Sequence, residues 1–155
     1  MFIRYFILFF FCGILISCSH VASSEDVKTS ILNIKDVPYI CRGNPGDEGC
    51  GDMYYWENII KGVESVPSLI ELIDDNTSIE VPVPNFGGDY TVGDIAIFQM
   101  SRIDEAFPLE TIIKNSIGYR GGNKMGGFWY YWKFVRESQA NRMLLKEEVK
   151  KWWNP

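Results

Sequence analysis

The chain contains a single histidine, His20, and none of its four cysteines forms a C-x-x-C pair. Nucleophile–histidine catalysis and histidine-bound zinc both need a histidine held in a folded pocket. Basic residues are also scarce: 15 Lys and Arg stand against 20 Asp and Glu, which gives a formal net charge of −5. Nucleic-acid binding needs a basic surface and anionic lipid heads attract basic segments, so this balance argues against both kinds of partner.

Long apolar runs are missing too. The longest, from Tyr5 to Ile16, would rise about 18 Å as a helix, which is too short for a hydrocarbon core of about 30 Å. It follows the basic Arg4 and ends at the small residue Ser17, an arrangement typical of a secretory signal with its cleavage site. We therefore expect residues 1–17 to be a removed leader. An uncleaved anchor or a buried N-terminal helix is the alternative.

The four residues Leu15-Ile16-Ser17-Cys18 resemble the lipobox of bacterial lipoproteins. The resemblance implies cleavage before Cys18, a diacylglycerol group on its sulfur and a fatty acyl chain, such as palmitate, on its new amine. One chain alone binds a membrane weakly, whereas two or three make a stable anchor. Ser19 stands where inner-membrane retention signals usually have Asp, which favours the outer membrane. The lipid bilayer is thus the first expected partner.

The other cysteines can be assigned once Cys18 is taken as lipidated. Cys12 leaves with the leader, so Cys41 and Cys50 remain as a pair, and an exported chain meets an oxidising compartment. We expect them to form a disulfide that closes a loop rich in glycine and contributes roughly 2.5–3 kcal/mol. A redox pair or metal ligands are the alternatives, although the spacing matches neither pattern. His20 lies on the tether beside the anchor, where no pocket is expected.

The mature chain is predicted to have two parts. Residues 18–35 are polar without a sustained period, and we expect a lipidated tether there, followed by a single all-α domain over 36–155. Prolines and glycines over 77–90 favour a long extended crossing loop. Helices are predicted at 53–61 after the cap Asp52, from Pro67, at 91–103 behind a capping box of Thr91 and Asp94, at 109–115, at 128–137, and from Ser138 to Trp153.

Two of these helices have informative faces. Trp56, Ile59, Ile60 and Val63 share one side of the helix that follows Asp52, and this spacing predicts its buried face. The helix over 91–103 is apolar nearly all round. A helix of that kind is usually covered on several sides, so we expect it to lie at the centre of the domain.

A weak internal repeat aligns Pro67 with Pro108, at a period of about 40 residues. Each unit is a helix, a short turn and a proline-initiated helix, which resembles a HEAT-type repeat over residues 53–116. An ordinary helical bundle is the alternative. Residues 41–154 also resemble small uncharacterised bacterial lipoproteins that carry the segment Tyr90-Thr-Val-Gly-Asp94, and this resemblance implies no activity.

Catalysis by this chain would have to rely on carboxylates. A glycoside hydrolase needs two carboxyl groups at a defined separation, and a Ca²⁺ loop needs a D-x-[DN]-x-[DN]-G pattern that the loop acids lack. Helix capping and solvated surface explain the acids more simply, so no catalytic residue, metal or cofactor is expected. The acids concerned are Asp47, Glu48, Asp52, Asp74, Asp75, Asp89 and Asp94.

The segment 118–127 is rich in glycine and carries Arg120 and Lys124. Its pattern matches neither G-x-G-x-x-G nor a P-loop. A mobile linker is favoured, and a recognition loop and an anion site are the alternatives. We take Arg120 and Lys124 as candidates for partner binding.

Aromatic residues occupy every position from 128 to 132. A helix cannot bury all of these consecutive side chains on one side, and exposed Tyr and Trp often anchor protein interfaces. We therefore take Trp129, Tyr130 and Trp132 as further candidates for partner binding. Packing in the core is the alternative for most of the aromatics.

These features together predict a membrane-anchored binding module of the bacterial cell envelope that is not an enzyme and binds a protein partner. One specific form is an immunity-type lipoprotein that inhibits a toxin delivered into the periplasm. A carboxylate-dependent hydrolase acting on glycans is the first alternative. A passive structural lipoprotein of the envelope is the second.

Overall fold

The computed structural model describes residues 22–38, 45, 47–116 and 127–154, with the backbone alone at 115–116 and 127–130. Outside the described residues lie the expected leader over 1–17, the expected lipidation site Cys18, the loop residue Cys41, and Arg120 and Lys124. The elements are α1 Ser24–Leu32, α2 Met53–Lys61, the 3₁₀ helix η1 Gly62–Ser65, α3 Val66–Glu71, β1 Ser78–Pro82, β2 Asp89–Thr91, α4 Val92–Ile103, α5 Leu109–Ser116, α6 Gly127–Glu137 and α7 Gln139–Trp153.

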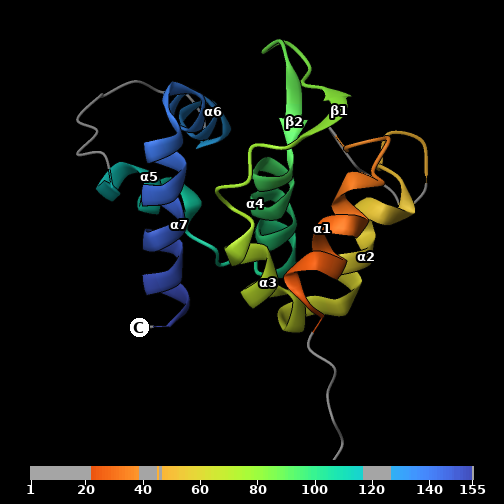
Figure 1. Ribbon diagram of the computed structural model, residues 1–155, viewed down its shortest axis with the longest axis horizontal. Helices are drawn as coiled ribbons and strands as arrows, with labels where there is room; N and C mark the ends of the chain where they lie inside the picture. Colours follow the sequence, from red (N-terminus) through yellow and green to blue (C-terminus); the bar gives the residue numbers. More distant parts are fainter. Residues whose placement is uncertain (1–21, 39–44, 46, 117–126, 155) are drawn as a thin grey trace, which may run out of the picture.

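α4 is the central helix of the domain (Figure 1). Its residues from Val92 to Ile97 are all buried, and α1, α2 and α3 contact it. Its first turn has the predicted capping box, in which Thr91 and Asp94 exchange side chain-to-backbone hydrogen bonds. The structure therefore confirms the prediction of a central helix that is covered on several sides.

α1 packs against the domain, which differs from the polar tether expected over 18–35. Val27, Ile31 and Ile34 are fully buried in the core. Their spacing of four and then three residues places them on one face of a helix. Polar neighbours obscure this short stripe in the sequence. In the structure, α1 packs against α2, α3 and α4.

The segment 77–90 contains a β-hairpin rather than the expected crossing loop. β1 and β2 pair antiparallel, with Ser78 opposite Thr91 and Pro82 opposite Asp89. The register is irregular between these pairs, and prolines and glycines hide the alternation that would mark a strand. The fold is therefore mostly helical with a two-stranded hairpin, not purely helical.

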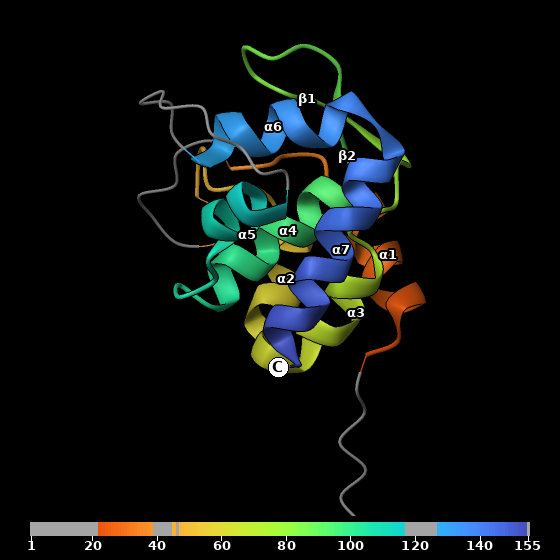
Figure 2. The same cartoon turned by 90° about the vertical axis from the view of Figure 1, so that its left-hand side faces the viewer.

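α5, α6 and α7 pack against one another on the side of α4 that lies opposite α1 and α2 (Figures 1 and 2). Figure 2 shows α6 crossing the top of the domain and α7 running down from it. Ser138 caps α7 as predicted, since its side chain accepts the backbone N–H of Asn141. Lys146 of α7 pairs with Asp74 at 2.9 Å and with Glu71 at 3.2 Å, and these ion pairs tie α7 to the end of α3.

Candidate functional site

The predicted aromatic segment forms the start of α6, and its described side chains are buried. Trp132 is 3% exposed and contacts the rings of Phe86 and Tyr90 edge-on, each at 5.9 Å between ring centroids. This position in the core contradicts its prediction as a partner-binding residue. The side chains of Trp129 and Tyr130 lie outside the described part of the chain, so their role stays a prediction.

Exposed apolar side chains gather on α2 and η1 instead. Met53, Ile60 and Val63 are 56%, 66% and 62% exposed. Met53 and Ile60 stand two helical turns apart and so share one face of α2, and Val63 follows in η1. We call Met53, Ile60 and Val63 the α2 ridge.

The outward position of Ile60 and Val63 overturns the prediction that they are buried. α2 turns a more polar face to the core, where Asn58 Nδ2 donates to Gln99 Oε1 of α4 at 3.2 Å. Gln99 Nε2 in turn donates to the backbone oxygen of Tyr55 at 2.7 Å. Buried amides need hydrogen-bond partners, and these lie on another helix that the local spacing of apolar residues does not reveal.

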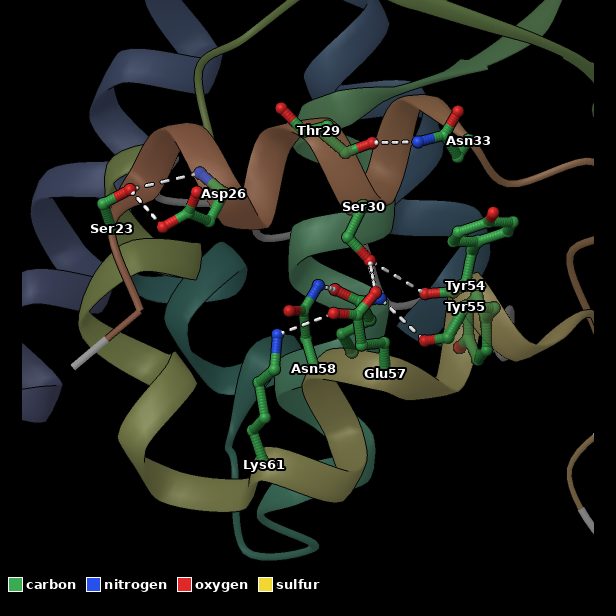
Figure 3. Close-up of polar contacts among 11 residues, drawn as sticks. Ser23, Asp26, Thr29, Ser30, Asn33, Tyr54, Tyr55, Glu57, Asn58 and Lys61 are labelled. Atoms are coloured by element: carbon green, nitrogen blue, oxygen red, sulfur yellow. Dashed lines mark hydrogen bonds and ion pairs between the residues drawn. The ribbon is translucent and has the colours of Figure 1, made fainter. Parts of the chain in front are cut away.

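A polar seam joins α1 and α2 (Figure 3), and its α2 residues Glu57 and Lys61 lie close to Ile60 along the helix. Ser30 Oγ donates to Glu57 Oε2 at 2.7 Å, and Lys61 Nζ pairs with Glu57 Oε1 at 2.8 Å. The hydrogen bond from Lys61, followed by that from Ser30, holds the pKa of the Glu57 carboxyl below its usual value. The exposed apolar residues are therefore bordered by a charged pair.

The cysteine loop ends beside α2. Asp52 caps this helix as predicted, since its Oδ1 accepts the backbone N–H of Tyr55 at 3.0 Å. Trp56 Nε1 donates to the backbone oxygen of Cys50 at 2.6 Å. Cys50 is buried and belongs to a disulfide, but it is the only cysteine among the described residues. Its pairing with Cys41 therefore stays a prediction.

A second polar cluster lies in the core, where α4, α6 and α7 meet. Asp94 Oδ1 accepts the Tyr131 hydroxyl at 2.7 Å and pairs with Arg142 Nη2 at 3.1 Å. Asp94 Oδ2 accepts the backbone N–H of Thr91 at 2.9 Å. Burial, reinforced by the Asp94 carboxylate, raises the pKa of Tyr131 well above its usual value. The hydroxyl therefore stays protonated and can act as a donor.

A pocket of about 400 Å³ opens beside Asp94. Arg142, which is 4% exposed, belongs to its wall, and its Nη1 is buried without a hydrogen-bond partner. We call it the α7 pocket because it includes the first residues of α7. Its lining residues are Asn76, Thr91, Asp94, Val135, Arg136, Ser138, Gln139 and Arg142.

Several of the acids considered for catalysis are engaged in structural contacts. Asp75 pairs with Lys28 at 2.7 Å, Asp52 caps α2, and Asp94 lies in the core cluster. In the described part of the chain, no group of three or more His, Cys, Asp and Glu side chains could hold a metal ion. Nor is any helix within these residues long and apolar enough to cross a membrane.

The sequence contained a signal for only part of these sites. The sequence predicts Asp94 as part of a capping box, and an acid in a helix that is apolar nearly all round indicates a buried partner. Nothing local pointed to Tyr131 or Arg142, because they come from other helices. Comparison with protein-family models, with curated proteins and with solved structures finds no match for this chain.

Proposed function

We propose that the chain is a lipid-anchored protein-binding module of the bacterial cell envelope. The observation that carries this proposal is the α2 ridge, whose three apolar side chains on α2 and η1 are each more than half exposed. Clustered apolar residues with a polar border are typical of protein interfaces. The lipobox-like segment supports anchoring in the outer membrane through an acylated Cys18.

A specific form of the proposal is an immunity-type inhibitor of a periplasmic toxin. The acidic charge, the small size and the proposed anchor suit a protein that is held at the membrane and binds a toxin delivered into the periplasm. The proposal includes a HEAT-like repeat in the order of the helices, α2 then α3 and α4 then α5, because each second helix begins near a proline. A toxin gene beside this one would favour the immunity form. Protection of cells that produce the toxin would test it directly.

Site-specific photo-crosslinking in intact cells tests the binding surface. A photoreactive amino acid in place of Ile60 should capture one partner, and Met53→Asp in the same chain should abolish the adduct, because a buried unpaired charge is costly at an interface. A matched control replaces Met143, which is 54% exposed on α7. The proposal fails if the two positions capture the same proteins, or if Met53→Asp leaves the adduct intact.

The anchor is tested separately. Cys18→Ala should remove labelling by radioactive palmitate and release the chain from the membrane fraction, because the acyl chains supply the membrane affinity. Cys12→Ala is the control, since the leader is expected to be removed. Labelling that persists in Cys18→Ala would contradict the proposed lipidation.

A further inference from the structure

The α7 pocket gathers positive charge in an acidic chain. Arg136 and Arg142 both line it, whereas the whole sequence has a formal net charge of −5. The pocket lies away from the α2 ridge, because α2 and α7 flank opposite sides of α4 (Figure 1). It therefore calls for an explanation separate from the proposed protein-binding surface.

Arg142 has donor capacity that the protein leaves unused. Its Nη2 pairs with Asp94 Oδ1 at 3.1 Å, but its buried Nη1 has no hydrogen-bond partner. A guanidinium carries five N–H donors and no acceptor. A buried charged donor without a partner is unfavourable, so an acceptor supplied by a ligand would be favoured here.

The N-terminus of α7 adds further donors to the same pocket. Ser138 has an extended backbone and accepts only the N–H of Asn141 with its side chain. The first N–H groups of a helix have no acceptor within the helix. This end of the helix also carries the positive end of its dipole, which favours an anion. α7 continues to Trp153, so this dipole is that of a helix of 15 residues.

Arg136 is held at the mouth of the pocket. Its guanidinium carbon lies 4.2 Å from the centre of the Trp132 ring, and its Nη2 contacts the backbone oxygen of Asp89 at 3.4 Å. A Cβ at Gly88 would come within 3.0 Å of this guanidinium, so the glycine makes room for it. A guanidinium stacked on an aromatic ring keeps edge N–H groups for a planar or tetrahedral oxyanion.

Asp94 is the carboxylate that also lines the pocket. Tyr131 and Arg142 occupy its Oδ1, and the backbone of Thr91 occupies its Oδ2. Its charge is thus matched by Arg142, and Arg136 with the helix end gives the pocket an excess of positive charge. We propose that the α7 pocket binds a small oxyanion, a phosphate or carboxylate group, between Arg136, Arg142 and the α7 N-terminus.

Thermal unfolding of the lipidated full chain in neutral detergent micelles tests the site. Inorganic phosphate and acetate are the probes, with chloride at matched ionic strength as the reference, because salt alone screens charge. A ligand that binds only the folded protein raises Tm in a saturable way. We expect saturation for at least one probe and none for chloride.

Arg136→Gln should weaken this binding about tenfold or more, because it removes a charge-assisted contact of an exposed residue. Each variant is compared with its own Tm without anion, so a change in stability does not mimic a change in affinity. Arg102→Gln removes an equal charge from an exposed position outside the pocket and should leave the affinity within about twofold.

The response to the two probes identifies the ligand group. Saturation by phosphate alone indicates a tetrahedral oxyanion, and saturation by acetate alone indicates a carboxylate; either result supports the site if Arg136→Gln reduces it. Equal stabilisation by chloride, no saturation with either probe, or unchanged affinity in Arg136→Gln would overturn the proposal.

Discussion

The Tyr131 hydroxyl donates a hydrogen bond of 2.7 Å to Oδ1 of Asp94, inside the core. Arg142 contacts the same oxygen, so one carboxylate joins α4 to both α6 and α7. Asp94 also caps α4 through Thr91. The Asp94 side chain therefore takes part in the capping box at the start of α4 and also attaches α6 and α7 to this helix.

Asp94→Asn should lower the free energy of unfolding by about 3–5 kcal/mol, because it leaves the Arg142 charge buried without its partner. Tyr131→Phe should cost about 1–3 kcal/mol, since it removes one buried hydrogen bond. Urea unfolding of both single variants and the double variant measures the coupling. Costs that simply add would show that the two residues act independently.

Alkaline pH should destabilise the protein through its buried tyrosines. Burial raises the pKa of Tyr55 to about 12, so the unfolded state loses this proton first, near pH 10. The resulting stability is complete below pH 10 and is lost as the pH rises toward 12, by roughly 2–3 kcal/mol. Tyr55→Phe should flatten the fall in unfolding free energy over this range. The exposed Tyr54→Phe is the control, and equal curves for the two variants would contradict the assignment.

α1 is predicted to be essential for the fold rather than part of a tether. Ile31→Ala should cost about 2–5 kcal/mol, because Ile31 is 0% exposed and its loss leaves a cavity. Leu32→Ala is a matched control, since the Leu32 side chain is itself 36% exposed and its truncation should cost far less. Similar shifts in the urea midpoint for both variants would mean that α1 does not pack as described.

Gly93→Ala should destabilise the domain, although alanine has a helix propensity about 1 kcal/mol more favourable than that of glycine. A Cβ at Gly93 would lie 2.3 Å from the backbone oxygen of Ile73. Overpacking against a fixed backbone costs about 1–3 kcal/mol or more, so the steric effect should prevail. Calorimetry should show a lower Tm, and a higher Tm would mean that the segment after α3 can move away from α4.

Helix starts could be predicted from the sequence because capping is local. Asp52, Thr91 and Ser138 each accept a backbone N–H within three residues of themselves. The hairpin was not predictable in this way. Glu80 of β1 has a positive φ of 58°, a strained conformation for a residue other than glycine, and it disturbs the alternation of the strand.

The sequence also could not predict which face of α2 points outward. Ile60 and Val63 have the spacing of a buried stripe, but Asn58 occupies the inner side because Gln99 of α4 satisfies its amide. Such a pairing joins residues far apart in the chain. The apolar pattern alone cannot choose between the two faces of so short a helix.

The sequence alone determined the helical character, the capped helix starts and the central position of α4, since these follow from neighbouring residues and their period. It also carries the lipobox-like segment that predicts the anchor. Only the tertiary structure decided that α1 joins the core, that the α2 ridge faces outward, and that Tyr131 and Arg142 meet at Asp94. Those choices depend on burial and on hydrogen-bond partners brought together from distant segments, and no local pattern specifies them.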